Sequence, residues 1–521
     1  MISSRFNITD RTRKWWVLAA MSTCISMIFI DQTILPVTIP SITKELAISE
    51  LVIQWILNSY LLALTIFVLA GGRLGDIFGH RKIATIGIIL FALSSALCGF
   101  STSGLWLIIA RFLQGIGGAL IVPTMPAILT ASFPNDQQGK ALGYYVSIGA
   151  FFLSIGPVLG GLLTQYFSWR YVFWINLPIA AIGLFLTWIS TPKSPTKEET
   201  FDFLGFFTIV FGISCIVMGL MQGEAWGWSQ WPVPTMIAVG ALLIFILAFF
   251  DRKVKDPFID FSLFKEPSYV VPAGIVFIVQ FMLMVGVFWS IYFQTVLNYS
   301  PSVAGFWSMI SSCPVIVFSH LAGHLSDRFG QKLPIMLGFL LAIFGLTWFV
   351  CVPTPSTPLL LLPFILPFGC GIPLILIPSG TLIMSSLPPL KRGVAIGMNS
   401  TLRQFSATLG LAVYGQILLS TQTRWFKDKL LADPSTTHLD PTEFEGLLAH
   451  AKPAIKALNA LPADIAQTVS HDFLTTYISA STLVNAIGLS VAVIGLALVI
   501  FLMKRKYTTS HDPSAITNES S

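Results

Sequence analysis

Fourteen apolar runs of about twenty residues restrict what this chain can fold into more than any other feature. About twenty helical residues cross the 30 Å apolar core of a bilayer. The runs lie roughly at 15–38, 51–71, 83–102, 105–126, 141–164, 172–190, 203–221, 233–250, 270–292, 303–322, 333–352, 359–385, 393–420 and 476–503. Only 10% of the residues are charged, well below the quarter that is usual in soluble domains. We therefore predict an all-α polytopic membrane protein with 14 transmembrane helices.

The basic residues indicate how the helices are oriented in the membrane. If the N-terminus is cytoplasmic, the short outer loops contain only Lys44 and Arg170, and most other bases flank the membrane on the cytoplasmic side. Cytoplasmic loops of membrane proteins normally carry such an excess of basic residues. We predict a multi-pass protein of the inner (cytoplasmic) membrane, with cytoplasmic tails at 1–14 and 504–521.

A charged, glycine-containing motif occurs twice, each time between two apolar runs. The first copy, GRLGDIFGHRK, covers 72–82, and the second, GHLSDRFGQK, covers 323–332. The copies follow the second and the tenth run, so two additional spans separate two six-helix halves. Both copies keep the same direction in the membrane, which predicts parallel repeats, an architecture of secondary transporters.

This arrangement divides the chain into three membrane regions. We expect a six-helix bundle at 15–190, two inserted helices with a cytoplasmic loop at 191–268, and a second six-helix bundle at 269–503. The second bundle includes a polar extracytoplasmic loop at 421–475, which is either a surface lid or a gate or docking surface for a periplasmic adaptor. A short amphipathic helix in this loop is predicted by the spacing of Leu447, Leu448, Ala451, Ile455 and Leu458.

Three charged residues lie inside apolar runs, where charge is costly and usually functional. Asp31 and Arg111 fall at similar depths in the first and fourth runs, so they meet if those helices pack together. Burial favours the neutral acid and a guanidinium favours the carboxylate, so a moving arginine or an arriving substrate would load or release a proton. The alternative is a permanent pair that only orients the helices.

Arg403 lies near the middle of the thirteenth run, with no acid left over to pair with it. It could bind backbone carbonyls or a substrate anion, or take part in gating. Gln114, one helical turn after Arg111, is a second candidate for substrate binding or gating.

Two other sets of residues are candidates for conformational roles. Gly156, Pro157, Gly160 and Gly161 combine a helix-kinking proline with small residues, as expected at an interface between moving halves. The repeated motif places an aspartate just past a helix end in each half, where it can cap a helix or pair with a base. These turns are predicted latches, formed by Gly72, Asp76, Arg81, Asp327 and Arg328; solvated loop charges are the alternative.

Several function classes find no support in the residues. The chain lacks a Gly-x4-Gly-Lys-Ser/Thr nucleotide-binding pattern, and its cysteines and histidines form no metal-ligand spacing. We expect neither an enzyme nor a cofactor, and no nucleic-acid partner, because the bases lie in short loops beside membrane segments.

The chain resembles the major facilitator superfamily, and within it the fourteen-spanner drug:proton antiporters of the EmrB/QacA type. The resemblance covers most of the chain and lies in 30–40, 72–82, 107–119, 156–161, 169–170 and 176–178, with Pro36 standing where that family usually has asparagine. It implies that Asp31 couples protons with Arg111 as its partner, that residues 156–161 mark an antiporter, and that some relatives use periplasmic adaptors.

We therefore expect a proton-coupled multidrug exporter of hydrophobic, neutral or monocationic compounds that works by alternating access. Its partners would be membrane lipid, protons, drug-like small molecules and a periplasmic adaptor. One alternative is a narrow-specificity exporter of a metabolite, siderophore or lipid-like compound. Another is a transporter-like fold that works as a sensor or scaffold.

Overall fold

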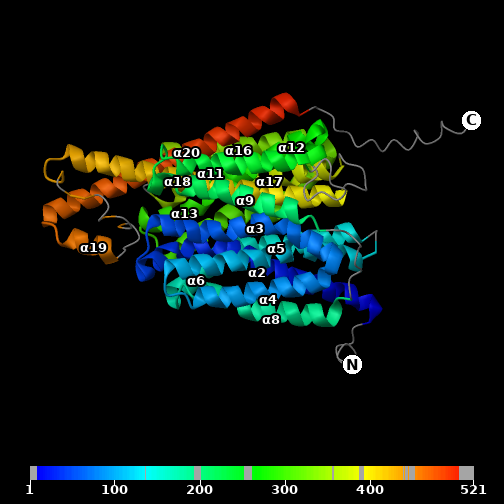
Figure 1. Cartoon of the computed structure of the whole chain (residues 1–521). Helices are drawn as coiled ribbons and strands as arrows, with labels where there is room; N and C mark the ends of the chain where they lie inside the picture. Colours follow the sequence, from blue (N-terminus) through cyan, green and yellow to red (C-terminus); the bar gives the residue numbers. More distant parts are fainter. Residues whose placement is uncertain are drawn as a thin grey trace, which may run out of the picture.

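The structure is a computed structural model that describes residues 9–503, with gaps at 135–136, 193–200, 251–260, 355–356, 386–391, 438, 441–443, 445–446 and 448–451. Every regular element in the described part is a helix (Figure 1). All fourteen apolar runs lie in helices, which confirms the predicted all-α membrane fold. Among the described residues, thirteen helical segments are long and apolar enough to cross a membrane. The run at 393–420 lies in α18, a more polar helix of 41 residues.

The N-terminal half is a bundle of six spans. It comprises α2 (Asp10–Leu46), α3 (Glu50–Phe78), α4 (His80–Gly99), α5 (Gly104–Ser132), α6 (Gln138–Tyr166), and the pair α7 (Tyr171–Trp174) and α8 (Asn176–Ser190). Helix α5 packs against α3 and α4, and α2 packs against α6 and α8. The arrangement brings α2 and α5 into contact, as the pairing of Asp31 with Arg111 requires.

The C-terminal half is built from more interrupted helices. It comprises α12 (Pro267–Leu283), η3 (Met284–Gly286), α13 (Val287–Thr295), α14 (Pro301–Ser312), α15 (Pro314–Phe329), α16 (Lys332–Cys351), η4 (Pro358–Leu361), α17 (Leu362–Ser385), α18 (Arg392–Ala432), α19 (Lys452–Asn459) and α20 (Ala463–Leu502). A proline begins α15 directly after α14, because it cannot donate the backbone bond that would continue the first helix.

The two inserted helices lie over a boundary between the halves. They are α9 (Phe203–Met221) and α11 (Pro232–Phe250), joined through α10 (Gly223–Trp226) and followed by η2 (Phe261–Lys265). Helix α9 contacts both α3 and α18, and α11 packs on α9. One apolar cluster joins Leu62 of α3, Val217 of α9 and Ala412 of α18. The α11 side chains Phe245 and Phe249 are exposed on the outside, as expected for a lipid-facing surface.

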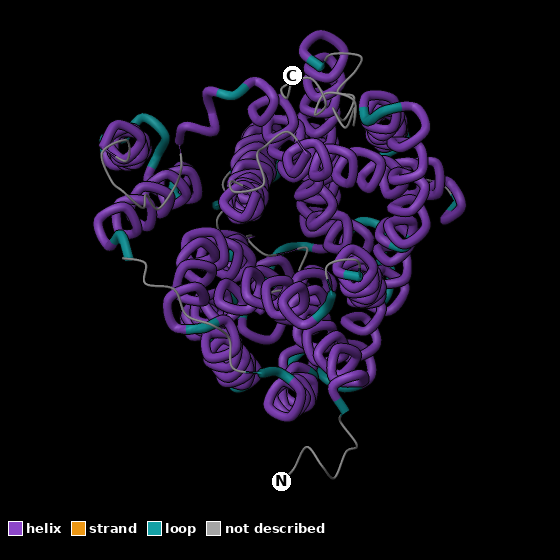
Figure 2. The backbone as a smooth tube through the Cα atoms, turned by 90° about the vertical axis from the view of Figure 1, so that its right-hand side faces the viewer, coloured by secondary structure: helices purple, strands orange, loops and turns teal. Residues whose placement is uncertain are grey.

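In the described part of the chain, the contacts between the two halves lie mostly from the middle of the molecule toward one end. We call the end that carries both chain termini the terminal end, and the opposite end the arm end (Figure 1). At the arm end one apolar cluster includes Ile34 of α2, Phe293 of α13 and Ala304 of α14, so it crosses between the halves. Toward the terminal end, the cluster that contains Val17 stays within the N-terminal half. Figure 2 looks along the helices from the terminal end and shows their two groups.

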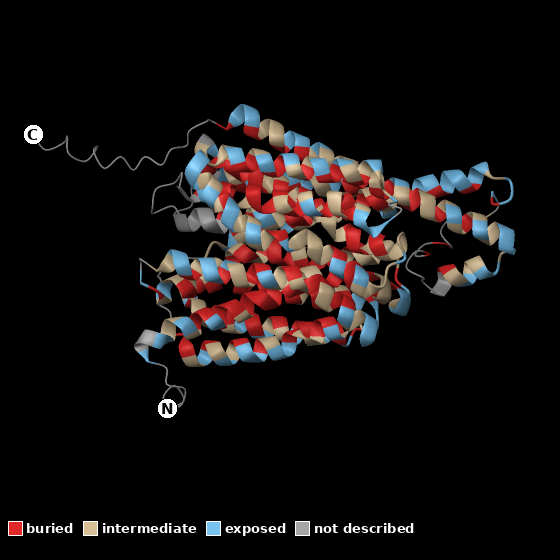
Figure 3. Ribbon diagram, turned by 180° about the vertical axis from the view of Figure 1, so that it is seen from behind, coloured by how far each residue is buried: buried red, intermediate tan, exposed pale blue. Residues whose placement is uncertain are grey.

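The segment predicted as a loop at 421–475 is largely helical instead. Helix α18 continues to Ala432, and α20 begins at Ala463, so both project beyond the bundle and form an arm with α19 between them (Figure 3). Phe426 and Phe473 pack at the centre of the arm, with ring centroids 4.8 Å apart. Helix α19 contains two residues of the predicted amphipathic pattern, whereas Leu448 and Ala451 lie outside the described residues.

Candidate functional site

A buried polar cluster surrounds Asp31 in the N-terminal half. Arg111 donates from Nη1 to Asp31 Oδ2 at 2.6 Å and to Gln114 Oε1 at 2.7 Å. Gln114 donates from Nε2 to Asp31 Oδ1 at 2.8 Å. Asp31 is 1% exposed and Arg111 is 2% exposed. The ion pair is therefore removed from solvent and held by a side chain one helical turn further along α5.

A second group of residues holds the cluster from α4, α8 and α3. Asn176 donates from Nδ2 to Ser95 Oγ at 3.0 Å and lies 3.4 Å from Asp31 Oδ1. The guanidinium carbon of Arg111 lies 4.2 Å from the centre of the Tyr60 ring, a cation–π distance. Asn176 begins α8, and Tyr60 lies mid-way along α3. The site thus joins five of the six spans of this half.

Some polar atoms of the cluster have no hydrogen-bond partner in the described part of the chain. Among the described residues, Arg111 Nε, Asn176 Oδ1 and the Tyr60 hydroxyl are buried without a hydrogen-bond partner. A carboxylate at Asp31 accepts the bonds from Arg111 and Gln114. A protonated Asp31 loses its charge and becomes a donor, which leaves the buried guanidinium of Arg111 without a counter-ion.

The glycines of α6 pack next to this cluster. A Cβ atom added to Gly156 would lie 2.1 Å from Thr33 Oγ1, and one added to Gly160 would lie 2.6 Å from the carbonyl oxygen of Ile34. Helix α6 thus lies directly against α2, two or three residues from Asp31.

The same segment of α6 also contacts the C-terminal half. A Cβ atom on Gly161 would lie 2.3 Å from the carbonyl oxygen of Pro301, and one on Gly305 would lie 2.2 Å from that of Pro157. One stretch of α6 therefore contacts the surroundings of Asp31 on one side and α14 on the other.

The repeated motif does not form loops of the predicted kind. Asp76 lies inside α3 and Asp327 inside α15, whereas the prediction placed both just past helix ends. The turns are made by Gly79 and Gly330, with φ of 92° and 78°, values that favour glycine. These glycines let each helix continue to the turn itself, so the motif is mostly helical.

The side chains of the motif make different contacts in the two halves. Asp76 Oδ1 lies 3.6 Å from His80 Nε2, and Arg81 donates from Nη2 to the carbonyl oxygen of Trp188 at 2.9 Å. In the second copy, the guanidinium of Arg328 lies 5.2 Å from the centre of the Phe329 ring. Gly72 lies in α3, where an added Cβ would be 3.7 Å from Pro123.

Arg403 is not among the residues that contact Asp31 or Arg111 in the cluster. It is exposed on α18, and no ion pair or hydrogen bond joins it to another residue in the part of the chain that is described. Gln114, grouped with Arg403 in the sequence analysis, instead belongs to the Asp31 cluster. Asn176 and Tyr60 were not predicted as site residues; the one available signal was the position of Asn176 at the start of the sixth span.

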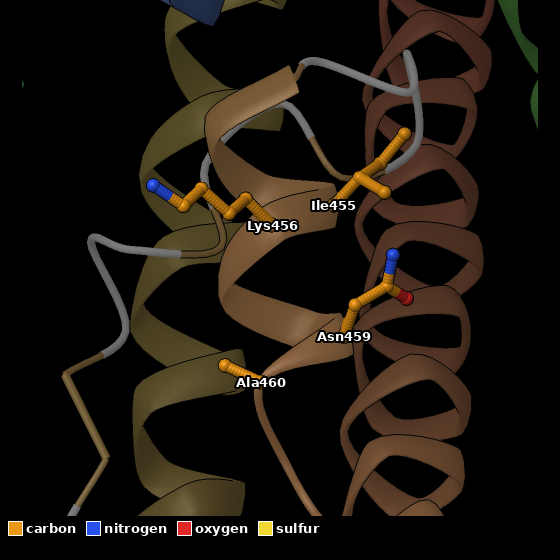
Figure 4. A pocket seen from close by; sticks show the side chains of 4 residues that line it. All are labelled: Ile455, Lys456, Asn459 and Ala460. Atoms are coloured by element: carbon orange, nitrogen blue, oxygen red, sulfur yellow. The ribbon is translucent and has the colours of Figure 1, made fainter.

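Hollows in the described part of the molecule include two that lie outside this cluster. One, of about 470 Å³, is on the arm and is lined by Ile455, Lys456, Asn459 and Ala460 of α19 and the turn after it (Figure 4). The other, of about 60 Å³, lies between the halves near the arm end. Among the described residues, no group of three or more His, Cys, Asp or Glu side chains is placed to hold a metal ion.

Two bundles of membrane-spanning helices that pack against each other, one of them with a buried ion pair, have the architecture of a membrane transporter. The sequence profile of the Major Facilitator Superfamily matches residues 21–411. The chain belongs to this superfamily, whose members are transporters rather than enzymes.

Relatives with known roles include drug-resistance proteins. The chain is 31% identical over 431 residues to the multidrug resistance protein Stp of Mycobacterium tuberculosis (strain CDC 1551 / Oshkosh), covering 81% of this chain and 80% of that protein. It is 28% identical over 498 residues to the tetracenomycin C resistance and export protein of Streptomyces glaucescens, covering 95% and 92%. The riboflavin transporter RibZ of Clostridioides difficile (strain 630) is 29% identical over 415 residues, covering 79% and 90%.

A solved structure supports the fold. A bacterial homologue of the human lysosomal transporter Spinster, in an inward-facing and unoccupied conformation, matches with a TM-score of 0.65. The match covers 95% of this chain and 99% of that one, at 15% sequence identity. At this identity the likeness shows the shared fold alone.

Proposed function

We propose that the protein is a proton-coupled exporter of hydrophobic, neutral or monocationic small molecules. The observation that carries this proposal is the buried pair of Asp31 and Arg111, which two amide side chains support. A static buried ion pair gives little net stability, because desolvation offsets its attraction. Uptake and release of one proton in each transport cycle is a function that accounts for a buried pair of this kind. The relation to drug-resistance and export proteins supports the choice of substrate class.

In this proposal, protonation acts on α6 through α2. When Asp31 is protonated, Arg111 loses its counter-ion and α2 and α5 move relative to each other. Thr33 and Ile34 transmit this movement to Gly156 and Gly160, because their contacts leave no free space. The opposite side of α6 touches α14, so the movement reaches the C-terminal half.

The proposal also assigns orientation and latches. The protein is placed in the inner membrane with the terminal end cytoplasmic, so the described conformation, with halves joined at the arm end, faces the cytoplasm. The residues of the repeated motif, Asp76 and Arg81 in one half and Asp327 and Arg328 in the other, then act as latches at the cytoplasmic mouth. The arm lies outside, where a periplasmic adaptor could bind it.

The first test is transport of a monocationic lipophilic dye in inverted membrane vesicles with an acidic lumen. Wild-type protein should accumulate dye, and Asp31→Asn should lose gradient-driven accumulation. A matched control is Asp472→Asn, which removes a carboxylate on the arm that pairs with Lys429 at 3.1 Å. Equal gradient-driven transport by Asp31→Asn and wild type would contradict proton coupling at this site.

The second candidate function is transport of one metabolite class. The riboflavin transporter among the relatives favours it, because that name denotes a single compound. Competition between the dye and unrelated hydrophobic compounds separates the two functions. Inhibition by many chemical classes supports multidrug export, whereas inhibition by one class supports the narrow carrier.

A further inference from the structure

Residues of both halves line the cavity of about 60 Å³, whereas the Asp31 cluster lies within the N-terminal half. Helices α2 and α3 bound it on one side, and α13, α18 and α20 on the other. Its walls are mostly apolar, but they include the polar side chains of Glu50, Gln54, Thr295 and Tyr477. A carboxylate thus lies at the junction that must open when the halves part at the arm end.

Gln54 indicates that the cavity is hydrated. Its Nε2 donates to the carbonyl oxygen of Gly415 at 2.7 Å, which joins α3 to α18. Its Oε1 is buried without a hydrogen-bond partner among the described residues. A buried acceptor without a donor is costly, and a cavity of this size has room for about two water molecules. Water in the cavity would satisfy Gln54 and contact Glu50.

The cavity and Asp31 lie along the same helix. Ile39 and Pro40 of α2 line the cavity, and at 1.5 Å per residue Asp31 lies about 12 Å further along α2. Opening of this cavity when the halves part therefore brings water closer to Asp31.

We propose that Glu50 is the proton-entry residue of this transporter. When the halves part at the arm end, its carboxylate takes a proton from water. While the halves are parted, water between them passes that proton on to the carboxylate of Asp31. Of the side chains that line the cavity, Glu50 and Tyr477 are the titratable ones. This inference rests on the proposed proton coupling at Asp31.

A simpler role for Glu50 is helix stabilisation. It lies in the first turn of α3, where a negative charge interacts favourably with the N-terminus of the helix. Such a role predicts a general loss of folded protein in a variant without the charge. The proton-entry role predicts a loss confined to steps that use protons from the arm side.

The test varies the lumen pH of inverted vesicles that contain the full chain, using the same dye. Glu50→Gln should slow gradient-driven transport about tenfold and flatten its dependence on lumen pH. Exchange of dye for dye without a gradient should stay at the wild-type rate, since it moves no net protons. Glu50→Asp keeps the acid and should restore most of the gradient-driven rate.

Glu45→Gln is the matched control. Glu45 lies at the same end of α2, accepts a hydrogen bond from Trp169 at 2.6 Å and pairs with Arg170, outside the cavity. Its variant should keep the wild-type dependence on lumen pH. If Glu50→Gln also keeps that dependence, or loses dye exchange as well, the inference is wrong and coupling at Asp31 is unaffected. If wild-type transport itself does not respond to the gradient, the proposed function fails and the inference fails with it.

Discussion

Gly156 is a position beside the Asp31 cluster where a single added carbon should disturb the packing of two helices. In Gly156→Ala the new methyl group meets Thr33 Oγ1 at 2.1 Å and forces α6 away from α2. We expect a loss of about 1–3 kcal/mol in stability from overpacking, together with slower transport. Thermal unfolding of the purified protein in detergent measures the first effect, and dye transport the second.

Gly143→Ala is the control for that change, because it lies on the same helix and an added Cβ meets nothing within 4 Å. Alanine is the better helix former, so the variant should be as stable as wild type or up to about 1 kcal/mol more stable. Equal melting temperatures for the two variants would mean that the contact between α6 and α2 is loose.

At the site, the sequence predicts charged partners better than neutral ones. The sequence predicts that Asp31 and Arg111 meet, because charges inside apolar runs are rare and the two residues lie at similar depths in the membrane. Asn176 and Tyr60 are ordinary residues in membrane helices, and only the folded arrangement places them beside the pair. The position of Gln114 could be inferred only as one helical turn from Arg111, so its bond to Asp31 was not foreseen.

At the scale of elements, the turns at Gly79 and Gly330 require glycine because of their backbone angles. At Gly330, lack of space for a side chain is not the reason. Gly330 has φ 78° and ψ 166°, a conformation almost confined to glycine, yet a Cβ there meets nothing within 4 Å. Gly330→Ala should cost about 1–3 kcal/mol through the backbone alone. Gly323→Ala, which is helical and equally unobstructed, should cost nothing. Comparison of their melting temperatures checks this, and similar values would contradict it.

The helices themselves were largely predictable, whereas their ends were not. Each apolar run marks a helix because only a helix satisfies its own backbone in lipid. The parts of α18 and α20 that extend into the arm have many polar residues, and prolines follow or precede them in the sequence. Their sequence is therefore similar to that of a loop. Their helical form depends on packing between Phe426, Phe444 and Phe473, which are far apart in sequence.

For the whole molecule, the proposed alternating access requires the contacts between the two halves to separate. Ser154 donates from Oγ to the carbonyl oxygen of Ser312 at 3.0 Å, which places α6 and α14 in contact. Cysteines at both positions, in a background with Cys313→Ser and Cys351→Ser, should form a disulfide that stops transport, and a reductant should restore it. Cysteines at Ser290 and Ser308, whose hydroxyl oxygens lie 2.8 Å apart, link α13 to α14 within one half, so they should leave transport intact. Full transport by the oxidised first pair would exclude this movement.

The conformational state of the whole molecule could not be predicted from the sequence. The duplicated motif predicts two halves, but the same residues must allow both the joined and the parted arrangement at each end. Which end is joined depends on small differences in packing, such as the cluster that crosses between the halves at the arm end. No local pattern encodes such a difference.

The inserted helices give this pseudo-symmetric molecule a closed side and an open side within the bilayer. Helix α9 covers the seam between α3 and α18, whereas neither inserted helix packs on α6 or α14 in the described part of the chain. Lipids on opposite sides of the same protein therefore meet different surfaces.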